Sequence, residues 1–204
     1  MPNPTPQRQL SVLQIAHDYL RRQVKPGDLC IDATAGRGFD TALLCELTGT
    51  QGKVLAFDIQ QEAVDSTRQL LAKNGYTNAE VFLDSHANLG QYAENGTVSA
   101  IVFNFGWLPR GSHEIFTHAD SSIAALNAGL KLLKVGGAMS LCVYYGGANG
   151  FTERDALLEY FRSLDSTYYT VLECQFPNRT GCPPFVVFIT KDAQPPISRS
   201  EAEV

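Results

Sequence analysis

The chain has 204 residues, 44% of them hydrophobic and 18% charged, which suits one well-buried core better than two separate domains. A net charge of -5 and an isoelectric point near 5.3 exclude a broad basic surface for duplex nucleic acid or for an anionic membrane. No apolar run reaches the ~20 residues of a membrane span and the N-terminus lacks the apolar core of a signal peptide, so we expect a cytoplasmic protein.

The first half of the chain alternates between helical patterns and short apolar strands. After a flexible lead at 1–9, helices are predicted at Leu10–Arg22, Phe39–Leu47 and Gln60–Lys73, with a short one near His86–Tyr92. Strands are predicted at 29–33, 53–58, 79–84 and 98–105. Strands separated by helices in this way imply right-handed crossovers and a parallel sheet that is covered on both faces.

The second half of the chain continues the alternation of helices and strands and then ends in two strands with no helix between them. A helix at Ala119–Leu133, ended by Gly136-Gly137, precedes a strand at 138–145 and a helix at Thr152–Ser163. The last strands, Tyr168–Gln175 and Phe185–Thr190, are joined by FPNRTGCPP, which is too short for a crossover helix and therefore predicts antiparallel pairing. The predicted fold is one α/β domain at 10–191, a Rossmann-like doubly wound sheet of seven strands, mostly parallel with an antiparallel last strand, followed by a frayed tail at 192–204.

The cysteines predict neither a disulfide framework nor a metal site. They are five in number, lie mostly inside apolar runs and show no C-x-x-C spacing. We interpret them as buried free thiols in a reducing compartment, and we expect no bound metal.

A glycine turn follows the first strand and precedes a helix, in the stretch DATAGRGFDT at 32–41. Glycine permits positive φ and close approach of a ligand, and the first N–H groups of the helix lack internal partners. In a doubly wound sheet, ligands bind at the carboxyl ends of the parallel strands, and this turn follows the carboxyl end of the first strand. The position of the third glycine of a dinucleotide fingerprint holds Thr41, which weakens a pyrophosphate interpretation.

Acidic residues at successive strand ends favour S-adenosylmethionine as the ligand of this turn. Asp32 is placed to meet the ammonium of an aminoacyl group, directly or through water, and Asp58 to accept hydrogen bonds from ribose hydroxyls. Asp84, Ser85 or His86 is placed to touch the adenine edge. The predicted cofactor residues are Asp32, Thr34, Gly36, Gly38, Phe39, Asp40, Thr41, Asp58, Ile59, Asp84, Ser85, His86 and Asn104.

This set of residues resembles the class I S-adenosylmethionine-dependent methyltransferases. DATAGRGFDT together with NFGWLPRG and VYYGG is similar to the bacterial family labelled "putative rRNA methylases", over about Leu10 to Lys191. That family includes the enzyme that N-methylates 5-aminomethyl-2-thiouridine at the wobble position of tRNA. The resemblance therefore implies methyl transfer to an aminomethyl group in a tRNA anticodon loop.

Asn104 ends the fourth predicted strand and is the candidate catalytic residue, together with the backbone carbonyl of Phe105. A side-chain amide oxygen and a neighbouring carbonyl can accept N–H bonds and aim an amine lone pair at the donated methyl group. His86, His113 and His118 are candidate bases for removing the proton of an alkylamine, and the sequence does not choose among them.

Aromatic and basic residues near the same edge form the predicted substrate site. Phe105 and three further aromatic residues could sandwich a base, and arginines, Arg37 among them, could hold phosphates. Single-stranded anticodon loops expose bases at low cost, so an acidic protein with a small basic rim is sufficient. The predicted substrate residues are Trp107, Leu108, Pro109, Arg110, Tyr144, Tyr145 and Arg179.

Several alternatives remain open from the sequence. They are a small-molecule N- or O-methyltransferase, which the negative charge favours, an rRNA methyltransferase, and a cofactor-binding regulatory module without catalysis. A homodimer is compatible with the sequence, which does not decide the oligomeric state.

Overall fold

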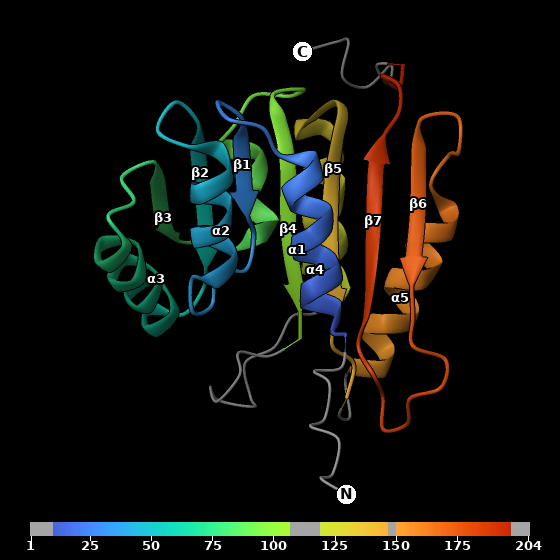
Figure 1. Ribbon diagram of the computed structural model, residues 1–204. Helices are drawn as coiled ribbons and strands as arrows, with labels where there is room; N and C mark the ends of the chain where they lie inside the picture. The colour runs from blue at the N-terminus through green and yellow to red at the C-terminus, as the bar shows by residue number, and fades with distance from the viewer. Residues whose placement is uncertain (1–9, 107–118, 147–149, 197–204) are drawn as a thin grey trace, which may run out of the picture.

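A seven-stranded sheet runs through the molecule in the order β3-β2-β1-β4-β5-β7-β6 (Figure 1). The computed structural model describes residues 10–106, 119–146 and 150–196. The strands are β1 Leu29–Asp32, β2 Lys53–Asp58, β3 Ala79–Leu83, β4 Val98–Phe105, β5 Leu133–Val143, β6 Tyr169–Cys174 and β7 Phe185–Lys191. β1 to β5 pair in parallel, whereas β7 pairs antiparallel with both β5 and β6. The predicted fold class is confirmed.

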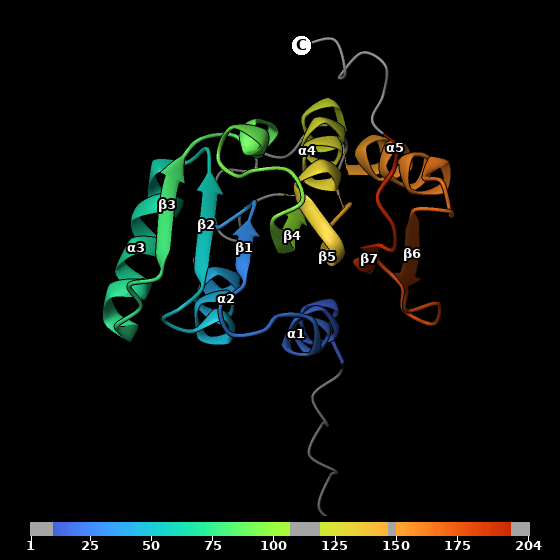
Figure 2. The ribbon, with the colours of Figure 1, turned by 90° about the horizontal axis from the view of Figure 1, so that it is seen from above.

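Helices cover both faces of the sheet (Figure 2). Their bounds are α1 Val12–Gln23, α2 Phe39–Thr48, α3 Gln61–Asn74, α4 Ala119–Leu132 and α5 Gly150–Ser163, with a 3-10 helix, η1, at His86–Gln91. α1, α2 and α3 lie on one face, and η1, α4 and α5 lie on the other. The sheet is therefore buried on both sides, which explains the continuous apolar runs of β2 and β4.

The chain reverses direction across the sheet between β1 and β4. β1 pairs with β2 on one side and with β4 on the other, so the carboxyl ends of these strands lie at one edge, called here the carboxyl edge. Phe185 begins β7 opposite Val143 at the end of β5, which brings the β6–β7 connection to the same edge. Ligands of doubly wound sheets bind at this topological switch point.

The expected role of Gly136-Gly137 as a helix stop is wrong. α4 ends at Leu132 and β5 begins at the next residue, so both glycines lie inside the strand. Val98 pairs with Leu133 but Ala100 pairs with Ala138, and this shift of register marks a bulge that takes up the extra residues. Gly136 adopts a φ of 81°, and a Cβ on Gly137 would lie 2.9 Å from the carbonyl oxygen of Val98.

The start of the predicted C-terminal tail is in contact with the sheet. Asp192, predicted as the start of a frayed tail, is instead tied to β6: its backbone N–H donates to the Tyr168 carbonyl at 2.8 Å, and its carboxylate accepts from the Thr170 hydroxyl at 2.6 Å. The predicted lead at 1–9 and the end of the tail at 197–204 lie outside the described residues.

The cysteines are free thiols, as predicted, although Cys174 and Cys182 are only partly buried. Within the described residues no group of three or more side chains is arranged to hold a metal ion. Across those same ranges we find no helix whose length and apolar character would carry it through a lipid bilayer.

Candidate active site

The glycine turn between β1 and α2 needs the backbone freedom that the sequence predicted. Gly36 and Gly38 have φ values of 54° and 82°, both in the left-handed region. Gly38 is also the N-cap residue of α2, and a Cβ there would lie 2.9 Å from the Cα of Thr67. The turn is therefore closely packed against α3 on one side, and its backbone takes a shape that side chains would strain.

Asp58, at the end of β2, holds this turn from the neighbouring strand. Its Oδ2 accepts the backbone N–H of Gly36 at 2.9 Å, and its Oδ1 accepts the backbone N–H of Gln60 at 2.9 Å. Burial raises the pKa of this carboxyl, and the backbone hydrogen bonds oppose that shift. The half-buried side chain thus links the carboxyl ends of β1 and β2.

We expect Asp58→Ala to weaken binding of an adenosyl cofactor by about 1–2 kcal/mol, because the turn loses its anchor and the site loses a charged acceptor. Calorimetric titration with S-adenosylhomocysteine measures the change. Asp65→Ala, which removes an exposed carboxylate of α3 that accepts a hydrogen bond from Gln61, is the matched control and should bind normally. Equal affinity in both variants would remove Asp58 from the site.

Asp32 is fully buried, and its predicted contact with an ammonium group, directly or through water, stays a prediction. Its Oδ2 accepts the Thr41 hydroxyl at 2.6 Å and its Oδ1 accepts the Thr34 backbone N–H at 3.2 Å. Burial, and then the charge of Asp40, raise the pKa of Asp32 to about 7. Asp32 therefore ties the turn to the first turn of α2.

This raised pKa predicts a pH effect on stability. Between the ordinary value of 3.8 and about 7 the folded chain keeps a proton on Asp32 that the unfolded chain has lost, so stability falls as pH rises through this range. We expect the free energy of unfolding of wild type relative to Asp32→Asn to decrease over the same range in urea denaturation. Asp18→Asn, at an exposed carboxyl of α1, should show no such trend. A difference that grows with pH would contradict the assignment.

The residues that follow β3 form hydrogen bonds with one another. Asp84 accepts the Ser85 backbone N–H and the Asn88 amide, both at 2.7 Å, and the Tyr92 hydroxyl at 2.6 Å. The Ser85 hydroxyl accepts the backbone N–H of Ala87 as the N-cap of η1. The predicted contact of these residues with adenine stays a prediction, and their observed part is to shape η1.

His86 lies in the core, and its predicted contact with adenine, like that of its two neighbours, stays a prediction. The residue is 8% exposed, and its ring makes edge contacts with Phe103 and Phe105. Its Nε2 has no hydrogen-bond partner among the described residues, and burial lowers its pKa to about 4. A ring enclosed in this way is poorly placed to take a proton from a substrate. The other candidate bases, His113 and His118, lie outside the described residues.

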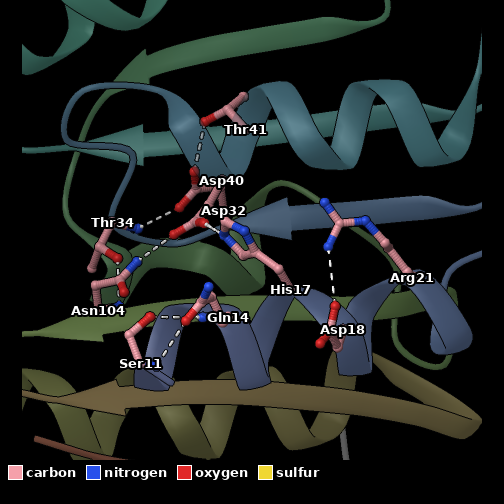
Figure 3. A network of polar contacts seen from close by, with 10 residues as sticks. All are labelled: Ser11, Gln14, His17, Asp18, Arg21, Asp32, Thr34, Asp40, Thr41 and Asn104. Atoms are coloured by element: carbon pink, nitrogen blue, oxygen red, sulfur yellow. Dashed lines mark hydrogen bonds and ion pairs between the residues drawn. The ribbon is translucent and has the colours of Figure 1, made fainter. Parts of the chain in front are cut away.

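Asn104 is held at the carboxyl edge by two hydrogen bonds (Figure 3). Its backbone N–H donates to the Thr34 hydroxyl at 2.7 Å, and its side-chain Nδ2 donates to Asp40 Oδ2 at 2.7 Å. The other oxygen of Asp40 lies 2.6 Å from Nε2 of His17. The strand end, the glycine turn, the first turn of α2 and helix α1 are thereby joined in one polar network.

His17 belongs to this network although it is not among the residues predicted from the sequence. It lies 23 positions before Asp40 and belongs to a helix that carries no glycine motif. A polar residue among the apolar positions of an amphipathic helix was the available signal. His17 is half-buried, with 26% of its side chain exposed, on the α1 surface that meets α2.

The predicted aromatic sandwich is not formed by the described residues. Phe105 is fully buried and stacks on Phe103, and its carbonyl already accepts the Tyr144 backbone N–H at 2.9 Å. Tyr144 packs with α1 on one face of the sheet, while Tyr145 packs with Phe185 on the other. Adjacent residues of an extended strand point to opposite faces, so these two rings cannot face one another across a base.

The described arginines of the predicted substrate site contact other parts of the protein. Arg179 stacks on Phe176 at 3.5 Å and donates to the Leu10 carbonyl at 2.7 Å, and Arg37 pairs with Glu62 at 3.1 Å. Three large apolar side chains at the carboxyl edge are instead exposed, namely Phe39 at 68%, Ile59 at 55% and Leu83 at 53%. Trp107, Leu108, Pro109 and Arg110 lie outside the described residues.

Proteins of similar sequence and structure carry the names of methylases and methyltransferases. Residues 54–190 match the family described as "Putative rRNA methylase". A chloroplastic tRNA (mnm(5)s(2)U34)-methyltransferase of Arabidopsis thaliana is 34% identical over 189 residues, which are 88% of this chain and 69% of that protein. The crystal structure of a "putative rRNA-methylase" from Clostridium thermocellum has a TM-score of 0.88 and 37% identity, covering 91% of this chain and 100% of that one.

A second solved structure bears on the cofactor. It is a "putative methyltransferase" from Streptococcus mutans in complex with SAH, with a TM-score of 0.82 and 33% identity over 90% of this chain and 99% of that one. The residues here fit such a group, because a bare glycine turn, a carboxylate at the end of β2 and exposed apolar side chains lie at one edge. This chain belongs to the family described as "Putative rRNA methylase" and is a methyltransferase that uses S-adenosylmethionine.

Proposed function

We propose that this methyltransferase acts on tRNA and N-methylates the aminomethyl group of wobble 5-aminomethyl-(2-thio)uridine. The observation that carries the proposal is a hydrogen bond from the amide nitrogen of Asn104 to the Asp40 carboxylate. The amide oxygen is therefore the end that can accept a hydrogen bond from a substrate N–H. The name of the Arabidopsis relative supports the choice of nucleoside.

For the cofactor we propose a division of roles along the carboxyl edge. The backbone of Gly36 and Gly38 lies against the aminoacyl part, and Asp58 accepts from the ribose hydroxyls. The exposed apolar surface of Ile59, next to Asp58, contacts the adenine. When bound, the cofactor supplies an electrophilic methyl group on a positively charged sulfur.

Catalysis then consists mainly of positioning. The neutral amine attacks the methyl carbon, the electron pair of the broken carbon–sulfur bond stays on sulfur, and the methylated nitrogen, now positively charged, can lose one proton to water. The Asn104 oxygen accepts one amine N–H and thereby aims the nitrogen lone pair. Near-attack geometry of this kind can supply up to ~7–11 kcal/mol of the barrier. The Phe105 carbonyl accepts the Tyr144 N–H with one of its two lone pairs, so it can accept at most one amine N–H, and Asn104 supplies the main orienting contact.

Methylation of defined RNA tests the proposal. The purified protein, given labelled S-adenosylmethionine and tRNA from cells that lack this gene, should place one methyl group on the wobble nucleoside, as measured by mass spectrometry of nucleosides. Unmodified transcript should accept none, because its uridine lacks the amine. Methylation of the bare transcript, or of ribosomal RNA in preference to tRNA, would overturn the assignment.

Two further expectations stay predictions. A cytoplasmic location rests on the sequence alone, and the Arabidopsis relative is by its name chloroplastic. A homodimer is tested by light scattering of the purified chain, where the mass of a single chain would exclude it.

A further inference from the structure

The network behind Asn104 contains Asp40, which holds the Asn104 amide, and His17, to which the proposed reaction gives no role. Asp40 lies in the first turn of α2, where the positive end of the helix dipole favours a carboxylate. Its side chain is 12% exposed and lies between His17 and Asn104, with one oxygen bonded to each. Such low exposure strengthens both hydrogen bonds and makes loss of either partner costly.

Asp40 decides which end of the Asn104 amide faces the substrate. An amide group can rotate by half a turn, which exchanges its oxygen and its nitrogen. A carboxylate oxygen only accepts hydrogen bonds, so it pairs with the amide nitrogen and repels the amide oxygen. With Asp40 in place, the oxygen points away from Asp40 and remains available as an acceptor.

His17 in turn decides where the Asp40 carboxylate lies. Its Nε2 is 2.6 Å from Oδ1, and the bond requires Nε2 to carry the proton, because the carboxylate cannot donate. The N–H of His17 also offsets the negative charge that Asp40 places near buried Asp32. Without this contact the carboxylate is free to turn toward solvent, and the amide of Asn104 loses its fixed partner.

We propose that His17 is a positioning residue for methyl transfer, acting through Asp40 to hold the Asn104 oxygen toward the acceptor amine. The inference deepens the proposed function and rests on it for the identity of the acceptor. Asp40, which the sequence suggested as a cofactor contact, acts here as the link between helix α1 and the reacting group.

Three variants of α1 test this role in the full chain. His17→Ala removes the donor, His17→Gln places an amide N–H near the position of Nε2, and Asp18→Asn is the control on the exposed side of the helix. With tRNA as substrate we expect His17→Ala to lower kcat by about ten-fold or more, with KM and cofactor affinity changed by less than about two-fold. His17→Gln should recover most of the loss.

A double-mutant cycle separates positioning from a general structural effect. In an Asn104→Ala background, His17→Ala should cause no further loss of kcat, because its route to the substrate is already removed. Additive losses would overturn the proposal. It would also fail if thermal stability, cofactor affinity and kcat fell together in His17→Ala, with no recovery in His17→Gln.

A measurement without substrate keeps this inference distinct from the proposed function. In protein labelled with ¹⁵N-asparagine, the side-chain NH₂ signal of Asn104 is identified by its disappearance in Asn104→Ala. We expect His17→Ala to shift this signal and speed its hydrogen exchange, while Asp18→Asn leaves it unchanged. If wild type does not methylate tRNA, the proposed function fails while this signal still reports the contact. An unaltered signal in His17→Ala would overturn the inference.

Discussion

Replacement of Gly38 by alanine is expected to destabilise the chain by about 3 kcal/mol or more. The residue has a φ of 82°, where a side chain costs roughly 1–2 kcal/mol. A Cβ would also lie 2.9 Å from the backbone Cα of Thr67, which α3 holds in place, so the turn or the helix must move. Because the same turn belongs to the cofactor site, affinity for S-adenosylhomocysteine should fall with stability.

A second glycine provides the matched control. Gly75 ends α3 with a φ of 74°, but a Cβ there would meet nothing within 4 Å. Gly75→Ala therefore carries the backbone strain without the collision and should cost only about 1–2 kcal/mol. Urea denaturation gives both values. Similar losses in the two variants would show that contact with Thr67 is not what constrains the turn.

Asn104→Ala is expected to lower turnover by about 100-fold while cofactor affinity stays nearly constant. The backbone bond from Asn104 to Thr34 survives this substitution, so the strand end keeps its position. What is lost is the oxygen that orients the acceptor, and an interaction made mainly in the transition state appears in kcat. Single-turnover transfer of labelled methyl and calorimetry with S-adenosylhomocysteine measure the two quantities separately.

The variant also leaves Asp40 without its amide partner, so some stability should be lost, on the order of 1–3 kcal/mol. Assays must therefore be made at temperatures where the variant is folded. Asn127→Ala, which removes an exposed asparagine that accepts a hydrogen bond from Tyr160, is the control and should retain full turnover. Equal losses of cofactor affinity and turnover in Asn104→Ala would indicate a structural asparagine.

The sequence was sufficient to predict where strands, helices and the glycine turn lie along the chain. β2, β4 and α2 begin where predicted, because continuous apolar runs, helical spacing and glycines act within a few residues. The positive φ values of Gly36 and Gly38 follow from the same local constraint. The antiparallel pairing of β6 and β7 was also predictable, since their short connection allows no crossover.

Local patterns failed where a neighbouring strand decided the outcome. Gly136-Gly137 looks like the end of a helix, yet the bulge opposite β4 places both glycines in β5. Phe105 looked like a stacking surface beside Asn104, and the alternation of β4 buries it against Phe103. In each case the residue type was consistent with both outcomes, and packing against another strand selected one.

A doubly wound domain, with a glycine turn and polar side chains at its carboxyl edge, can be predicted from the amino-acid sequence. Which of those side chains contact one another depends on how the helices pack on the sheet. Asp32 is enclosed by its contacts with Thr34 and Thr41, while Asp40 joins His17 to Asn104 across separations of 23 and 64 residues. No local pattern encodes such contacts, because they arise when the packing of α1 and α2 on one face of the sheet brings distant residues within hydrogen-bond distance.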